Sequence, residues 1–346
     1  MQSKFTEETR KLQFTGGSTY IISLPKRWID QNQLKRGSLI KIREEEDGFL
    51  SIMPADTVIQ QERDETSIKV NPKDSPDLVI RKTVSAYLIG YNILHIKGEG
   101  QKQLSTKQRH EIKTFSRNML VGTEIVTDTP DELTLQVLLS YPELSVQSAL
   151  RRMSIITASM HRDAITALKE LDIQHAEEVA ITDNEVDRFN LYIVRQLKTA
   201  IQNSRIIKEI GLKNARECLG YRLVTKAVER TADHAARIAD NVLLMKNKLE
   251  SETIEKLEGM SSLAVSMFET SIESLFRQDY VLAESIVEKT KDIDSLENAA
   301  VVSSQKIDVE DAPHLRLIIE SIRRTAEYAS DIAEVVLNLT VESILL

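Results

Sequence analysis

The stretch RTADHAARIADNV at residues 230–242 recurs as RTAEYASDIAEVV at residues 324–336, 94 positions later. Seven of the thirteen positions are identical, and acidic character is kept at others, as in Asp233 and Glu327. Self-similarity at a fixed separation is the sequence sign of a duplicated structural unit. The C-terminal part of the chain is therefore predicted to hold two copies of one fold.

Apolar or small residues recur in both copies in alternating steps of three and four. This spacing places them on one face of a helix, which predicts one buried stripe in each copy. The stripe positions are 224, 228, 231, 235, 238 and 242, and then 318, 322, 325, 329, 332 and 336.

Further helical patterns precede each copy, and long helices with short links favour a bundle. They cover residues 146–171, 183–197, 254–277 and 294–304. We therefore predict two tandem three-helix bundles, at residues 146–250 and 251–346.

Composition agrees with a mainly α fold, because aromatic residues make up only 5% of the chain and charged residues 28%. The single cysteine, Cys218, excludes an internal disulfide and a thiolate metal cluster within one chain. No apolar run is long enough to cross a bilayer, and no leader pattern opens the sequence. A soluble, cytoplasmic protein is expected.

Charge divides the chain unevenly. Residues 1–43 hold nine Lys or Arg and three acidic residues, whereas the whole chain has a net charge of −8. A basic end on an acidic protein is typical of contact with a polyanion.

The basic segment also contains the turn residues that are typical of β-hairpins. Gly16 and Gly17 supply a tight turn between two short strands, and Pro25 begins a short helical stretch that ends before Gly37. A second hairpin, over residues 39–53, is predicted around the Asp47-Gly48 turn signal. We assign residues 1–55 to a small head.

Residues 56–145 are predicted to form a linker and a small α/β insert. The acidic, proline-bearing stretch 56–77 is interpreted as a solvated link. Helices at 78–88 and 106–119 and strands at 93–96, 124–127 and 134–139 follow. His95 and His110 are isolated and are interpreted as surface or core residues. A ligand-sensing role and a spacer role stay open for this region.

Four carboxylates in the first bundle have the spacing of a metal site. Asp183 and Asp187 lie four residues apart, as do Glu229 and Asp233, so each pair shares one helical face. Oxygen donors without histidine or cysteine suit Mg²⁺, Mn²⁺ or iron better than zinc. A solvated acidic face is the alternative. His234 is interpreted as a packing or surface residue.

The second bundle departs from this set. Thr290 stands where Asp183 stands in the first bundle, and Arg323 stands in the place of Glu229. Only Asp294 and Glu327 keep their carboxylates, so we predict an ion pair or no ligand in this bundle.

Residues 10–54, with their order of strand, glycine turn, strand ending in LPK, short helix, LxxG, strand, DG and strand, resemble the AbrB/SpoVT/MazE swapped-hairpin head. The resemblance implies a homodimer in which two chains interleave into one β-barrel that binds DNA. The candidate DNA-binding residues are Arg10, Lys11, Lys26, Arg27, Lys35 and Arg36. A head that only dimerises or docks a partner is the alternative.

The duplicated body, with its acidic pairs, resembles PhoU, the phosphate-uptake regulator, in an arrangement of archaeal type. The PhoU resemblance implies metal clusters at the acidic pairs, with Asp183, Asp187, Glu229 and Asp233 as ligands here. It also implies a non-enzymatic, negative regulator of phosphate transport. Expected partners are DNA, phosphate transporter subunits or a signalling protein.

Two other functions are considered. One is a carboxylate-bridged metalloenzyme, but such helix-bundle sites usually add histidines at Glu-x-x-His spacing, which the proposed ligands lack. The other is a transporter-associated adaptor without DNA binding, which a salt-dependent DNA titration would distinguish.

Overall fold

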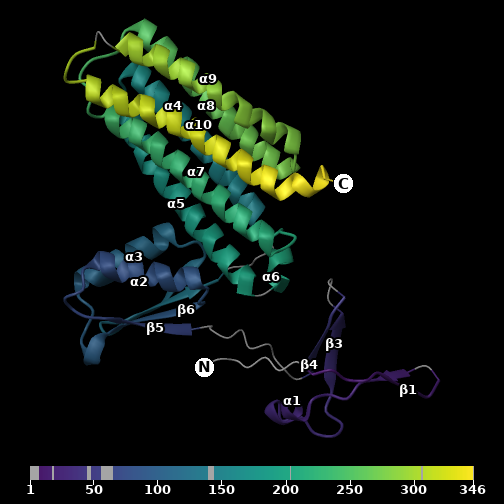
Figure 1. Ribbon diagram of the computed structural model, residues 1–346. Helices are drawn as coiled ribbons and strands as arrows, with labels where there is room; N and C mark the ends of the chain where they lie inside the picture. The colour runs from purple at the N-terminus through teal and green to yellow at the C-terminus, as the bar shows by residue number, and fades with distance from the viewer. Residues whose placement is uncertain are drawn as a thin grey trace. The chain divides into compact units, whose positions relative to one another are not determined.

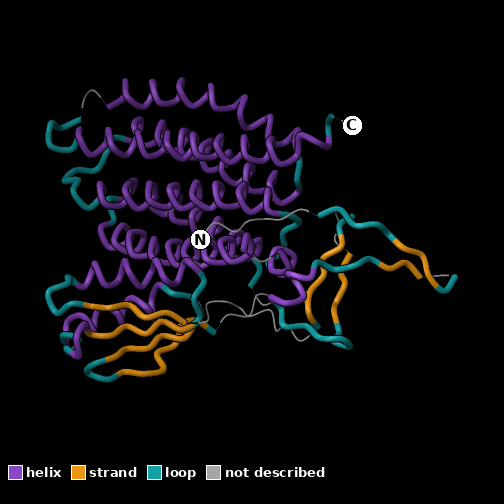
Figure 2. The backbone as a smooth tube through the Cα atoms, turned by 60° about the horizontal axis from the view of Figure 1, so that its bottom comes forward, coloured by secondary structure: helices purple, strands orange, loops and turns teal. Residues whose placement is uncertain are grey.

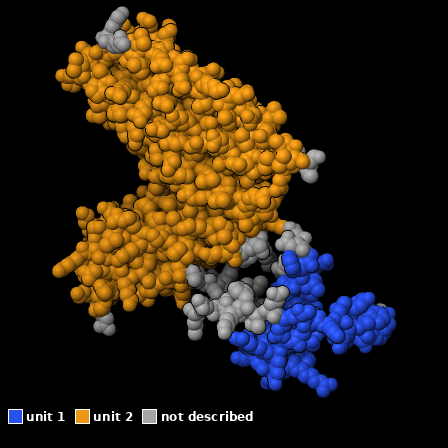
Figure 3. Space-filling model, viewed as in Figure 1, with its two compact units in different colours: residues 1–62 blue, residues 63–346 orange. Residues whose placement is uncertain are grey.

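The computed structural model describes residues 8–17, 19–44, 48–55, 65–138, 144–202, 204–304 and 307–345. The chain divides into two compact units, Met1–Glu62 and Arg63–Leu346 (Figure 3). The predicted Asp47 turn and the first part of the predicted link, residues 56–64, lie outside the described residues.

Unit 1 contains two separate antiparallel hairpins and one short helix (Figure 1). β1 (Gln13–Thr15) pairs with β2 (Thr19–Ile21), and β3 (Ile40–Glu44) pairs with β4 (Leu50–Pro54). α1 (Lys26–Gln31) follows Pro25, as predicted. Gly16 has a φ of +63° and Gly17 a φ of +79°, which explains why the first turn uses glycine.

The predicted strand order is thus present, but the hairpins of one chain lie in two different sheets and close no barrel among the described residues of the head. Nor is any described head residue buried. A barrel would require strands from a second chain.

The insert is a four-stranded sheet in the order β5-β6-β8-β7, with α2 (Pro76–Ile89) and α3 (Thr106–Met119) packed on one face (Figure 2). Its strands are β5 (Glu65–Val70), β6 (Ile93–Gly98), β7 (Thr123–Asp128) and β8 (Glu132–Val137). β5 and β6 are parallel, and the other pairs are antiparallel. Residues of alternate strand positions, including Leu94, Ile96 and Leu133, form its core against the helices.

The interpretation of residues 56–77 as a solvated link is wrong for its second part, because β5 is an edge strand of this sheet. Ile68 and Val70 point into the core, while the residue between them is exposed. Two apolar residues gave too short a period-two signal to be separated from the charged stretch before them.

Two three-helix units form the body. The first contains α4 (Val146–Glu170), α5 (Ile173–Gln202) and α7 (Ala215–Val242), with the short α6 (Ser204–Glu209) between α5 and α7. The second contains α8 (Ser251–Arg277), α9 (Tyr280–Ser303) and α10 (Ala312–Thr340), followed by the 3₁₀ turn η3 (Val341–Ser343).

The two units share one hydrophobic core. α10 packs on α7 and α8, and α4 also packs on α7 and α8, so these four helices form the centre, with α5 and α9 outside (Figure 1). All twelve predicted stripe positions on α7 and α10 are buried. The stripe prediction is therefore confirmed.

Local signals fix where the helices begin. Ser145 begins α4 by accepting a hydrogen bond from the Ser148 backbone N–H at 3.1 Å, and Asn214 begins α7 in the same way toward Glu217. Such caps satisfy backbone donors that the first turn leaves unpaired. Leu171 and Gln278 end α4 and α8 with left-handed φ values of 52° and 53°, so the two copies also end their first helix alike.

Candidate functional site

The four predicted metal ligands lie at one place between α5 and α7, which pack side by side. Asp183 and Asp187 are half-buried, Glu229 is 9% exposed and Asp233 is exposed. Asp187 interacts electrostatically with Glu229, and Asp183 with both Asp233 and Glu229. The helices therefore bring the two acidic pairs against each other, as the spacing predicts.

Burial and mutual repulsion oppose ionisation of this acidic cluster. Burial raises the pKa of Asp183 to about 7, with further contributions from Asp187, Asp233 and Glu229. Although Asp233 as a whole is exposed, partial desolvation of its carboxyl group and then the nearby Glu229 raise its pKa to about 6. The pKa of Asp187 is raised by burial and by Glu229. A positive charge placed near such crowded carboxyl groups would favour their ionised form.

The residues around the acidic cluster neutralise only part of its negative charge. The Lys226 Nζ forms an ion pair with Glu229, whereas Asp183 Oδ1 is buried without a hydrogen-bond partner. Because a buried unpaired oxygen is unfavourable, this atom has unused capacity to bind a donor or a metal. In the described ranges, no three His, Cys, Asp or Glu side chains are arranged to hold a metal ion, so the four carboxylates would have to change rotamer to bind one.

The second bundle differs as predicted. Arg323 Nε lies 3.1 Å from Glu327 Oε1 and 3.6 Å from Glu297 Oε2. Asp294 is exposed. The predicted ion pair is thus present at the position where the first bundle carries Glu229.

Histidines take no part in the acidic cluster among the described residues. His234 is 8% exposed, and its ring lies 5.7 Å from that of Tyr328, so it packs between α7 and α10. His95 is bound on the open face of the insert, with Nδ1 2.6 Å from Glu132 Oε1. Glu132 comes from another strand, so only the sheet register could reveal this pair.

Arg195 is a buried residue of α5 whose role the sequence pattern did not show. Its guanidinium donates to the backbone oxygens of Tyr87 and Gly90 and, at 2.8 Å, to Asn92 Oδ1. Tyr87 and Gly90 lie at the C-terminal end of α2, where the helix dipole favours a positive charge. Arg195 therefore joins the insert to the helix that carries Asp183.

The six candidate DNA-binding residues are all exposed. Lys26 and Arg27 occupy the first turn of α1, and Lys35 and Arg36 follow that helix. Arg10 forms an ion pair with Glu8, so one of the six cations is partly neutralised within the chain.

Comparison with known proteins follows this division of the chain. The sequence model of the PhoU domain matches residues 150–242 and 257–336, which is half of the chain. The chain belongs to the PhoU family. The model of antidote-toxin recognition MazE, bacterial antitoxin, matches residues 13–76. This PhoU-family chain thus carries an N-terminal head of AbrB/MazE type.

Individual relatives are similar over part of the chain. The phosphate-specific transport system accessory protein PhoU homolog of Aquifex aeolicus is 27% identical over 138 residues, covering 38% of this chain and 58% of that protein. PhoU from Pseudomonas aeruginosa has a similar fold, with a TM-score of 0.51 and 19% identity over 57% of this chain and 96% of that one. The phosphate transport system regulatory protein PhoU of Streptococcus pneumoniae matches with a TM-score of 0.49, 21% identity and coverage of 56% and 92%.

No helix in the described ranges is both long and apolar enough to span a membrane.

Proposed function

We propose that this chain is a DNA-binding regulator of phosphate uptake, in which the helical body receives a signal and the head acts at a promoter as a negative regulator. The observation that carries the proposal is the union of a PhoU body with an AbrB/MazE-type head on one polypeptide. Because the curated relative is matched over only part of its length, its role in transport supports this proposal and does not define it.

A second copy of the chain is the expected partner of the head. Phe49 is 71% and Leu39 77% exposed, and apolar surface of this kind gains stability when it leaves water. Large apolar side chains are exposed along both hairpins, at Leu12, Phe14, Tyr20, Ile21, Ile22, Leu39, Ile40, Ile42, Phe49 and Leu50. Interleaving of two heads would bury these residues and leave the basic side chains free for phosphate groups.

DNA binding is tested with the full chain on its own upstream DNA over a range of salt concentrations. Neutralising Arg10, Lys11, Lys26 and Arg27 to Gln should weaken binding and lower the salt slope by roughly 0.9 for each DNA phosphate that is no longer neutralised. The matched control changes four exposed body lysines to Gln, namely Lys198, Lys248, Lys289 and Lys291. Equal affinity of both variants at moderate salt would leave the adaptor without DNA binding as the better description.

A divalent cation is the proposed ligand of the acidic cluster. Its donors are carboxylate oxygens alone, which suit Mg²⁺, Mn²⁺ or Fe²⁺. Asp183, Asp187, Glu229 and Asp233 would hold the ion, which would supply positive charge where the fold leaves carboxylates crowded. The structural support is the unpaired Asp183 Oδ1 together with the raised pKa values of Asp183 and Asp233.

The metal content of the purified parent and variant proteins tests the acidic cluster as a metal site. Replacing Asp187 and Asp233 by Asn keeps their shape and removes two charges, so the purified protein should lose bound Mn or Fe. The same replacement of exposed Asp294 should change nothing. Equal metal content in the parent and both variants would show that the acidic cluster is only a solvated face.

The competing proposal, a carboxylate-bridged metalloenzyme, has weaker support. His234, the histidine beside Asp233, packs against Tyr328 instead of approaching the cluster. Metal-loaded protein that hydrolyses phosphoesters or reduces oxygen in proportion to its metal content, and loses both activities in the Asp187 and Asp233 variant, would favour the enzyme.

A further inference from the structure

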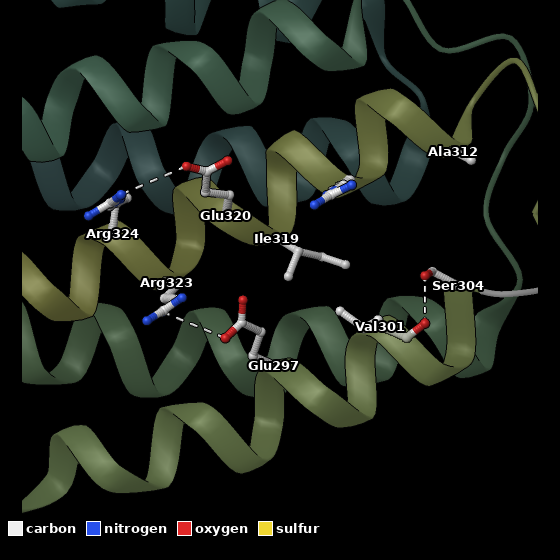
Figure 4. Close-up of a pocket in the computed structure, with 9 residues that line it drawn as sticks. Glu297, Val301, Ser304, Ala312, Ile319, Glu320, Arg323 and Arg324 are labelled. Atoms are coloured by element: carbon white, nitrogen blue, oxygen red, sulfur yellow. Dashed lines mark hydrogen bonds and ion pairs between the residues drawn. The ribbon is translucent and has the colours of Figure 1, made fainter.

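A groove of about 500 Å³ lies between α9 and α10 in the second bundle (Figure 4). Its lining combines guanidinium, carboxylate and apolar groups, from Glu297, Val301, Ser304, Ala312, Arg316, Ile319, Glu320, Arg323 and Arg324. None of these residues belongs to the acidic cluster of the first bundle.

The charges that line this groove are reversed between the two copies of the repeat. With the 94-residue offset of the repeat, Lys226 and Glu229 of α7 correspond to Glu320 and Arg323 of α10. The sign of the charge is therefore reversed at both positions, from Lys226 to Glu320 and from Glu229 to Arg323.

The arginines of the groove differ in how far they are neutralised. Arg323 and Glu297 point toward each other across the groove (Figure 4), at 3.6 Å, and Arg324 is paired with Glu327 at 2.7 Å. Arg316 is exposed and has no carboxylate within 4.0 Å among the described residues. It lies seven residues, or two helical turns, before Arg323 and so shares its face. Among the described residues, Arg316 thus has no ion pair, whereas Arg323 shares its charge between Glu297 and, at 3.1 Å, Glu327.

We propose that this groove binds a small organic phosphate of nucleotide size. Arg316 and Arg323 would hold the phosphoryl group, because a planar guanidinium donates two hydrogen bonds in the geometry that phosphate oxygens accept. The volume exceeds what one phosphate ion fills and lies within the range of small-molecule sites, roughly 300–1,000 Å³. Val301, which is 45% exposed, offers an apolar surface to a ring, and Glu320 can accept from hydroxyl or amino groups.

Calorimetric titration of the full chain with AMP tests the site. EDTA is present, so that the result is independent of any cation at the acidic cluster. Arg316→Gln should weaken AMP binding roughly tenfold or more, the size of one missing hydrogen bond to a charged group. Glu297→Gln should strengthen it, because Arg323 then loses one of its two competing carboxylates and keeps only Glu327.

Arg216→Gln is the matched control, since Arg216 is an exposed arginine of α7 paired with Glu342 at 2.6 Å and lies outside the groove. Adenosine should not bind, and inorganic phosphate should bind more weakly than AMP. AMP affinity that is equal in the parent and in the Arg316 and Glu297 variants would overturn the proposal and place any nucleotide on the basic head. Phosphate that binds as tightly as AMP, or no AMP binding by the parent, would also overturn it.

Discussion

At the scale of single residues, the raised pKa of Asp183 predicts how the stability of the fold depends on pH. Its pKa is raised from 3.8 to about 7 in the folded chain, so the folded state holds this proton more tightly than the unfolded state does. The stabilisation is therefore complete below about pH 4 and is lost as the pH rises toward 7. In the presence of a chelator, Asp183→Asn should raise the melting temperature at pH 8 by a few degrees and have little effect at pH 4.

Thermal unfolding followed by circular dichroism measures this difference. Asp294→Asn, which removes an exposed carboxyl from the corresponding helix of the second bundle, is the control and should be nearly neutral at both pH values. A parent and an Asp183 variant with parallel pH profiles would contradict the assigned burial of that carboxyl. Added Mn²⁺ should raise the melting temperature of the parent more than that of the variant.

Arg195 makes a second prediction at this scale. Arg195→Met removes the hydrogen bonds that Tyr87 O, Gly90 O and Asn92 Oδ1 accept from the guanidinium, and a hydrogen bond to a charged group contributes about 1.5–3 kcal/mol. The destabilisation should appear as faster hydrogen exchange in α2 and β6, with the centre of the helical body unchanged. Lys198→Met, one turn away and exposed, should leave this exchange as it is. Uniform acceleration over all helices would mean that Arg195 stabilises the body as a whole.

At the scale of elements, the repeat predicts that a metal site can be restored in the second bundle. Thr290→Asp together with Arg323→Glu gives α9 and α10 the carboxylates that α5 and α7 carry. The double variant should bind about one more Mn²⁺ ion per chain than the parent, because α9 and α10 would then carry donors at the same spacing as α5 and α7. Thr290→Asp alone, with Arg323 kept, is the control. If neither variant gains metal, the carboxylate set alone is insufficient.

Elements were predicted well where the period of apolar residues was long and regular. Every stripe position of α7 and α10 is buried, because a helix of many turns repeats its signal many times. β5 was missed, since a strand with two buried residues carries little signal. Asp183 and Glu229 could be paired from spacing and the repeat, whereas Arg195 could not, because its partners Tyr87 and Gly90 follow from tertiary packing alone.

At the scale of the whole molecule, α5 is the element through which the body could act on the rest of the chain. It carries Asp183 and Asp187 of the acidic cluster, and Arg195, about two turns after Asp187, holds the insert. The insert begins with β5, which directly follows the segment that leads from the head. A signal that shifts α5 would therefore reach the insert through the hydrogen bonds of Arg195.

The last prediction concerns coupling between the two units. If cation binding at Asp187 and Asp233 weakens DNA binding by some factor, DNA must weaken cation binding by the same factor, and such coupling is usually about 1–3 kcal/mol, roughly 5- to 150-fold. Inserting a Gly/Ser segment after Asp64 lengthens the connection ahead of β5. Both affinities should persist, while the coupling shrinks because a Gly/Ser link transmits orientation poorly. DNA titrations with and without Mn²⁺ give the coupling in the parent and lengthened forms. Equal coupling in the two forms would mean that a direct contact between head and body carries the signal.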